Sequence, residues 1–262
     1  MTRDPVAPPH VEPRAPAEPG TASVAAVALP EHTQERTGPM VTYAESIDIL
    51  EDELMTLLDI FKGLTAEEWQ METKLVPLDA AQRHWTVFEL AGHFDISIGL
   101  TRMLIADPKD GQVGRDRVSF FIFPRSEVAP VVYDYAYTMV AGKSPADMPA
   151  VLEETFTKTI EESRSVDPGL VGSGYYALME VGEFVPSRVV EAVVHGFDLT
   201  DALGREAVPS PAAVSVAAEI LDELLARRTV GGRPADLSDD LAWVRAASGR
   251  APHDDPRLPL IG

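Results

Sequence analysis

The stretch RVVEAVVHGFDL, residues 188–199, is mostly apolar, yet it places Glu191 and His195 four positions apart. Side chains four apart share one face of an α-helix, with their Cβ atoms roughly 5–6 Å from each other. A carboxylate and an imidazole at this spacing can reach a single ion. The alternative is a simple hydrogen-bonded pair on a half-exposed helix face. Both interpretations require residues 188–199 to be helical.

Helix signals along the rest of the chain indicate a mainly α-helical fold. We expect the helix of the quoted stretch to span about 186–203, with Pro186 in its first turn and Gly204 as its stop signal. Thr86 and Glu89 have the spacing of a capping box at a second helix start. Apolar residues at helical spacing predict further helices, which begin near Tyr43, cover about 86–106, begin at Ser144 and Pro145, and cover about 211–228.

Residues 118–141 are aromatic and apolar without a clean period, so the pattern does not separate helix from strand there. Their side chains could line a pocket, although a place in the hydrophobic core is the simpler interpretation.

Composition narrows the class of protein. The 262 residues carry a formal charge of −20, which repels phosphate backbones and anionic lipid and so disfavours nucleic-acid and membrane partners. No run has the roughly 18–20 apolar residues that cross a bilayer. The chain has no cysteine, which excludes disulfides, cysteine-ligated zinc and a cysteine nucleophile. We expect a soluble, cytoplasmic protein whose partner is a small-molecule substrate; the oligomeric state stays open.

The distribution of residues along the chain indicates three parts. Residues 1–40 hold eight of the 22 prolines and almost no aromatics, a composition that predicts a disordered leader. We expect a metal-binding helical bundle over residues 41–206. Residues 207–262 are expected to form a short C-terminal helical extension.

Three side chains form the candidate metal site. His93 lies mid-helix beside Gly92, and a bundle that faces this helix toward the quoted stretch would bring His93 to Glu191 and His195. Three protein ligands with an open fourth position are typical of catalytic zinc. Two histidines and one carboxylate also describe non-haem iron, so spacing leaves zinc and other divalent metals open.

Polar neighbours suggest supporting roles. Glu89 lies four positions before His93 and Asp198 three after His195, so each carboxylate could orient the second ring nitrogen of a histidine. Glu89 could instead serve only as the helix cap, and Asp198 as a solvated charge. Arg188, one turn before Glu191, could bind a substrate carboxylate or form a salt bridge.

Two segments together resemble a known family. HWTVFELAGHFDIS (84–97) and PSRVVEAVVHGFDLTDALG (186–204), preceded by LTAEEWQMET (64–73), resemble the mycothiol-dependent maleylpyruvate isomerase family of the DinB-like metalloenzymes. The resemblance covers about residues 43–204. It implies a DinB-like four-helix bundle in which His93, Glu191 and His195 hold a metal, usually zinc, and a low-molecular-weight thiol such as mycothiol binds that metal as cosubstrate.

Two departures limit what the resemblance implies. The isomerase carries a sizeable α/β domain after its bundle, whereas only 58 residues follow Gly204 here. Residues 107–145 are also longer and more aromatic than a simple connection between bundle helices. Maleylpyruvate itself is therefore not the expected substrate.

Three functions remain in view. The first is a zinc-dependent thiol transferase or isomerase that uses a bound thiol on an electrophilic small molecule. The second is a thiol-independent metalloenzyme that tailors a specialised metabolite by hydrolysis, elimination or rearrangement. The third is a non-catalytic small-molecule binding protein on the same scaffold.

Overall fold

The computed structural model describes residues 41–174 and 177–261. The predicted leader, residues 1–40, lies outside the described residues. In the part described, helices dominate, as the helical periodicities predicted, and one short hairpin, which was not predicted, forms the sheet.

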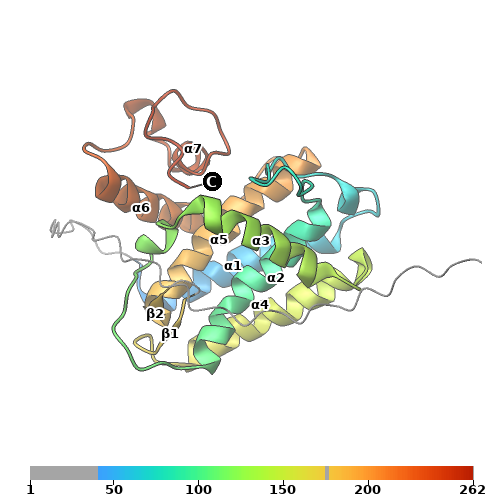
Figure 1. The fold of residues 1–262 in the computed structure, drawn as a ribbon, viewed down its shortest axis with the longest axis horizontal. Helices are drawn as coiled ribbons and strands as arrows, with labels where there is room; N and C mark the ends of the chain where they lie inside the picture. The colour runs from blue at the N-terminus through green and yellow to red at the C-terminus, as the bar shows by residue number, and fades with distance from the viewer. Residues whose placement is uncertain (1–40, 175–176, 262) are drawn as a thin grey trace, which may run out of the picture. The chain divides into compact units, whose positions relative to one another are not determined.

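Four long helices pack side by side around a shared apolar core (Figure 1). Helices α1 and α2 each pack against both α4 and α5, so the order around the group is α1, α4, α2, α5. The aromatic ring of Phe61 on α1 meets that of Phe94 on α2 at a centroid distance of 5.7 Å, in the middle of the group. The four helices are α1 (Tyr43–Lys62), α2 (Val87–Ala106), α4 (Met148–Ser165) and α5 (Val181–Leu203).

Shorter elements complete the described fold. Helix α3 (Arg125–Val140) packs on α2, and strands β1 (Val171–Ser173) and β2 (Leu178–Glu180) pair antiparallel ahead of α5. Helix α6 (Pro211–Arg228) packs against α5, and α7 (Asp240–Ala247) packs against α6. Single 3₁₀ turns lie at Glu68–Gln70, Ser119–Phe121, Pro145–Asp147 and Ala235–Leu237.

The predicted helix boundaries are confirmed where local capping sets them. Thr86 and Glu89 form the capping box of α2, since the Glu89 carboxylate accepts from the Thr86 backbone N–H at 2.8 Å. Helix α1 stops at Gly63, whose N–H caps the last turn. Helix α5 ends at Gly204 with a left-handed φ of 63°, which glycine adopts without steric cost.

The predicted start of α5 is wrong by about one turn. The helix begins at Val181, so Pro186 lies inside it and not in its first turn. A proline at this position leaves the carbonyl of Gly182 without its helical donor. The guanidinium of Arg117 donates to that carbonyl from 3.3 Å, which compensates for the missing N–H.

Residues 118–141 form one 3₁₀ turn followed by α3, which resolves the ambiguity between helix and strand. Gly92 explains how closely α3 approaches α2. A Cβ atom at Gly92 would lie 2.7 Å from Val140 Cγ1 and 2.8 Å from the Ala136 carbonyl oxygen. The missing side chain therefore serves helix packing.

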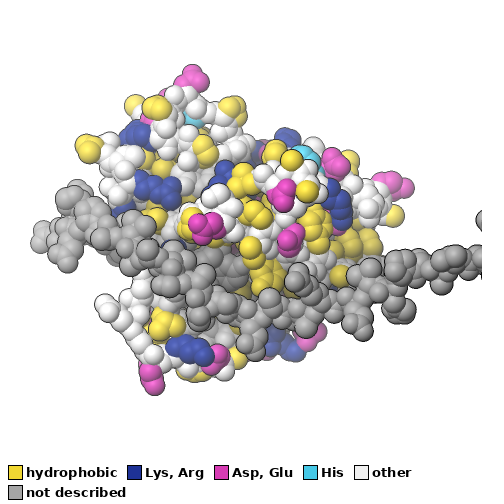
Figure 2. Space-filling view, in the orientation of Figure 1, with side chains coloured by type: hydrophobic (Ala, Val, Ile, Leu, Met, Phe, Trp, Pro, Cys, Tyr) yellow, Lys and Arg dark blue, Asp and Glu magenta, His cyan; other side chains and the backbone are white. Residues whose placement is uncertain are grey.

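On the face shown in Figure 2, acidic and basic side chains are interspersed with apolar ones. Over the described residues, no helix combines the length and the apolar character needed to span a bilayer.

Candidate metal centre

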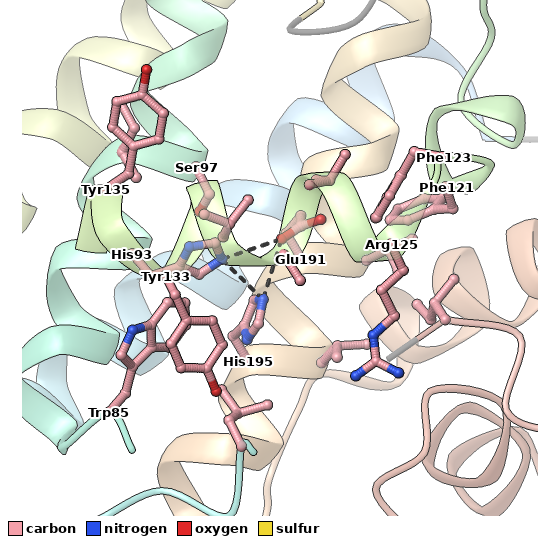
Figure 3. Close-up of a pocket in the computed structure, with 18 of the residues that line it drawn as sticks. Trp85, His93, Ser97, Phe121, Phe123, Arg125, Tyr133, Tyr135, Glu191 and His195 are labelled. Carbon is pink, nitrogen blue, oxygen red and sulfur yellow. Dashed lines mark hydrogen bonds and ion pairs between the residues drawn. The ribbon is translucent and has the colours of Figure 1, made fainter. Parts of the chain in front are cut away.

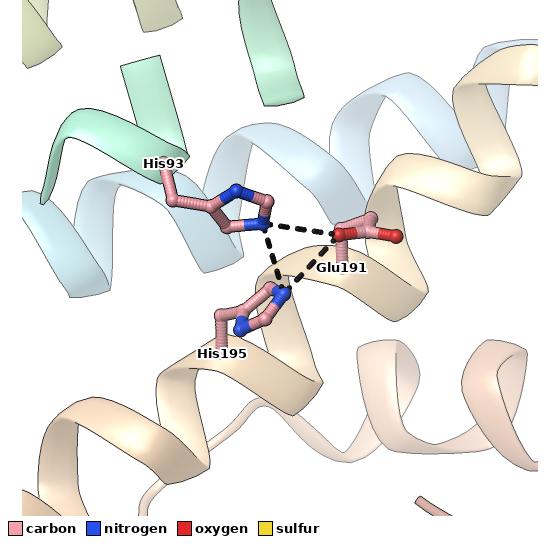
Figure 4. A group of neighbouring side chains, drawn as sticks. All are labelled: His93, Glu191 and His195. Atoms are coloured by element: carbon pink, nitrogen blue, oxygen red, sulfur yellow. Dashed lines mark hydrogen bonds and ion pairs between the residues drawn. The ribbon is translucent and has the colours of Figure 1, made fainter. Parts of the chain in front are cut away.

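His93, Glu191 and His195 meet in the structure, as the sequence predicted (Figure 4). His93 projects from α2, and the other two project from one face of α5. The Nε2 atoms of the two histidines lie 3.0 Å apart, and Glu191 Oε2 lies 3.6 Å from the first and 3.3 Å from the second. Two helices that are distant in the sequence thus deliver three donor atoms to one point.

The donor set fits a zinc ion. Nitrogen and oxygen ligands of tetrahedral zinc, at their usual bond lengths, lie roughly 3.3–3.5 Å from one another. The three separations above, 3.0, 3.3 and 3.6 Å, bracket this range. All three donors are borderline or hard atoms of the kind that zinc and other divalent transition metals accept.

Asp198 orients His195. Its Oδ2 accepts a hydrogen bond from His195 Nδ1 at 2.8 Å, which leaves the lone pair of Nε2 directed at the other two donors. The carboxylate is in turn held by Arg250, whose Nε and Nη2 donate to its two oxygens at 3.0 and 2.7 Å. The contact between Asp198 and His195 that the spacing suggested is therefore present.

Glu89 does not orient His93. Its carboxylate is occupied by the α2 cap and by Arg83 Nη2 at 2.6 Å. Nδ1 of His93 is buried and has no hydrogen-bond partner among the described residues. The indole ring of Trp85 lies 5.1 Å from the imidazole ring of His93, centroid to centroid, and packs beside it. The alternative assignment of Glu89, as a cap alone, is the one that the structure supports.

Burial and mutual contacts set the charges of the three donors. Burial, with the neighbouring His195, lowers the pKa of His93 to about 4. Burial alone would raise the pKa of Glu191, but the neighbouring His195 and His93 and the charge of Arg188 bring it well below its ordinary value. Burial would lower the pKa of His195, but its hydrogen bonds with Asp198 and Glu191 raise it instead. At neutral pH the site therefore holds an ionised carboxylate and a neutral His93.

Arg188 does not form the salt bridge that was one of its two expected roles. It is 1 % exposed and forms no salt bridge with any described carboxylate. Its guanidinium donates to the Ser97 carbonyl at 3.1 Å and to Ser187 Oγ at 3.0 and 3.2 Å. The rings of Phe120 and Phe184 each lie 4.4 Å from its central carbon.

A cavity of about 230 Å³ opens beside the three donors (Figure 3). Helices α2, α3 and α5 supply most of its wall, and the segment after α7 adds Arg250 and Ile261. The sequence left open whether the aromatic residues of 118–141 lie in the core or line a pocket. Phe120, Phe121 and Tyr133 do both, since they are buried in the core and also line this cavity.

Sequence reasoning missed two residues of this site. Arg250 lies in a polar segment without periodicity, and only the folded chain brings it to Asp198. Tyr133 belongs to the aromatic stretch 118–141, and the high aromatic content of that stretch was the sequence signal that could have pointed to it. Its ring stacks on Trp85 at 4.3 Å, and its buried hydroxyl has no hydrogen-bond partner among the described residues.

The chain matched no protein-family model, no curated protein and no solved structure. A function for this protein is therefore inferred from the geometry and chemistry of the site.

Proposed function

We propose that this protein is a zinc-dependent enzyme that acts on a small molecule with the help of a bound low-molecular-weight thiol. In this proposal the four packed helices are a DinB-like bundle, and the activity is that of a thiol transferase or isomerase similar to the mycothiol-dependent enzymes. The supporting observation is the convergence of His93, Glu191 and His195 from two helices on the wall of a cavity.

Zinc bound by these residues would lower the pKa of a coordinated thiol and keep it as the reactive thiolate. The protein's own side chains have other tasks. Glu191 acts as a ligand, because its oxygen faces both imidazoles and its pKa is held far below neutral. Asp198 fixes the tautomer of His195, and Arg250 fixes Asp198. The reactive sulfur would come from the thiol cosubstrate, since the chain contains no cysteine.

The cavity supplies a water-poor environment. Apolar side chains from three helices surround the donors, and a low local dielectric strengthens the interaction between a thiolate and a cation. We place the enzyme in the cytoplasm, where small thiols are kept reduced.

Metal analysis followed by thermal shift tests this proposal. The protein is stripped with a chelator, reconstituted with zinc, and melted with mycothiol, glutathione and the S-methylated form of each. A thiol that binds the folded zinc form stabilises it by about 2.7 kcal/mol at a concentration of a hundred times its Kd. We expect one zinc per chain and stabilisation by a free thiol but not by its thioether. Failure to bind zinc, or equal stabilisation by thiol and thioether, contradicts the proposal.

Two histidine-to-alanine variants, one inside and one outside the donor cluster, form a matched pair. His93→Ala removes a proposed ligand, whereas His84→Ala removes a histidine that lies outside the donor cluster. We expect His93→Ala to lose both zinc binding and thiol-dependent turnover, with His84→Ala close to wild type. Turnover that depends on His93 but continues without any thiol would favour the metabolite-tailoring metalloenzyme, and zinc binding with no turnover would favour a binding protein.

A further inference from the structure

Arg188 is a buried cation that forms no salt bridge with a carboxylate among the described residues, and the charge of nearby Glu191 acts on it only at longer range. Two arginines of the described chain are buried, Arg117 at 9 % exposed and Arg188 at 1 %. Arg117 forms a two-pronged ion pair with Glu183, at 2.7 and 2.9 Å. Arg188 has only neutral acceptors, the Ser97 carbonyl and the Ser187 hydroxyl. Unlike Arg117, Arg188 therefore has no carboxylate in hydrogen-bonding contact, and the carboxylate that acts on its charge, Glu191, is itself one of the candidate metal ligands.

The environment of Arg188 keeps the guanidinium charged and oriented. Removing a cation from water without an anionic partner costs several kcal/mol, so such groups are rare unless a ligand uses them. Phe120 and Phe184 place their rings against the guanidinium, and cation–π attraction offsets part of this cost. Burial lowers the pKa of Arg188 only to about 10, so the side chain stays charged at neutral pH.

Arg188 also lines the cavity that holds the metal donors. A guanidinium has five N–H groups, and the three hydrogen bonds to Ser97 and Ser187 leave two N–H groups for a ligand. Much of the remaining wall is apolar and includes Leu75, Leu78, Leu100, Val132 and Val194. Tyr133 also lines the wall, and its buried hydroxyl has no partner in the described chain.

We propose that the cavity takes a small, largely apolar molecule that carries a carboxylate or similar anionic group, and that Arg188 binds this anion next to the metal centre. The anion would be the substrate of the proposed enzyme, and to that extent its assignment rests on the proposed function. Arg188 and Glu191 are three positions apart on α5, so their Cβ atoms lie roughly 5–6 Å from each other.

Calorimetric binding of a matched pair of probes, 1-naphthoate and its neutral analogue 1-naphthamide, tests the inference. The titrations use the full chain in excess chelator, because a carboxylate could otherwise bind the ion instead of Arg188. A charge-assisted pair of hydrogen bonds favours the anion over the amide by about tenfold or more. The same titrations on Arg188→Met should reduce this preference to near unity. Arg125→Met, which removes an exposed arginine from the same cavity wall, should retain it.

Each result has a definite meaning. Equal binding of the two probes to the wild type overturns the inference, as does a preference that disappears in Arg125→Met and survives in Arg188→Met. If Arg188→Met does not fold, Arg188→Lys replaces it and should lower the preference without abolishing it, while equal binding of the two probes to the wild type still overturns the inference. The chelated titrations do not depend on zinc, so a lost anion preference in a protein that binds zinc rejects this inference only. A preserved preference in a protein that never binds zinc rejects only the proposed metalloenzyme.

Discussion

His195 Nδ1 donates a hydrogen bond to Asp198 Oδ2 over 2.8 Å, and this contact joins the candidate metal centre to the segment after α7 through Arg250. The carboxylate raises the basicity of the ring and selects the tautomer that leaves Nε2 free to bind a metal. Although Asp198 is buried, its pKa is lowered to about 2, because Arg250 and His195 outweigh the effect of burial. It therefore stays ionised at any pH at which the site would hold a metal.

Asp198→Asn should weaken zinc binding by about 10- to 100-fold, because the uncharged amide supports His195 less well. Competition titration against a chromogenic chelator measures the change. Asp201→Asn is the matched control, since Asp201 lies on the same helix and accepts from Arg245 at 2.9 Å without contact to a histidine. A similar loss of affinity in both variants would mean that only general stability had changed.

Glu89→Ala should separate capping from metal binding. Loss of the capping box destabilises the fold by about 1 kcal/mol, visible as a lower midpoint in urea. Zinc affinity should stay at the wild-type value, because the carboxylate makes its hydrogen bonds to Thr86 and Arg83. Weaker zinc binding by a folded Glu89→Ala protein would restore the role that the sequence spacing had suggested for this residue.

Gly92→Ala and Gly99→Ala, both on α2, test the close contact with α3. A methyl group at Gly92 would meet backbone and side-chain atoms of α3 at under 3 Å, whereas at Gly99 the nearest atom, in Thr155, is 3.5 Å away. Overpacking costs about 1–3 kcal/mol, and the better helix propensity of alanine returns up to about 1 kcal/mol. We expect Gly92→Ala to be destabilised and Gly99→Ala to be neutral or stabilised in urea denaturation. The prediction fails if the two variants have equal midpoints.

Glu53 predicts a pH dependence of stability. This carboxylate of α1 is 2 % exposed, and burial raises its pKa even though the backbone N–H of Ser210 donates to it at 2.9 Å. A raised pKa in the folded state means that the contribution of Glu53 is fully present below the pKa of the unfolded chain. That contribution is lost as the pH rises through the folded value.

Glu53→Gln, which keeps an acceptor for Ser210, should therefore melt higher than wild type at pH 8 and equally near pH 4. Each kcal/mol corresponds to roughly 2–4 °C in a chain of this size. Glu67→Gln, on the surface, serves as the control and should change stability by less than about 0.5 kcal/mol at either pH. A Glu53→Gln protein that is less stable than wild type at pH 8 would show that the charged hydrogen bond outweighs the cost of burial.

Capping and helix-stop patterns predicted those helix ends that residues close in the sequence determine. The cap at Thr86 and the stop at Gly204 depend on residues within one or two turns, and both are confirmed. The three donors were also predictable, because His93 and the Glu191–His195 pair lie on apolar helices that have to face inward in any bundle. What the spacing could not show is whether the donors bind a metal.

The misses depend on contacts between distant segments. The sequence placed Pro186 in the first turn of a helix, but it lies inside α5. The carbonyl of Gly182, which loses its helical donor there, accepts a hydrogen bond from Arg117, 69 positions before Pro186 in the sequence. Arg250 reaches Asp198 across 52 positions, a separation on which periodicity carries no information. The 118–141 stretch lacked a period because its side chains contact the core on one side and the cavity on the other.

The backbone N–H of Leu260 donates to the Ala247 carbonyl at 2.7 Å and so holds the segment after α7 against that helix, and Ile261 of this segment lines the cavity. In the proposed metalloenzyme, metal binding and docking of this segment would be one linked equilibrium, since an ion that holds His195 also favours the Asp198–Arg250 pair. Amide hydrogen exchange across residues 248–261 should therefore slow when zinc is added, so this segment would report on metal binding at a site to which it contributes no ligand.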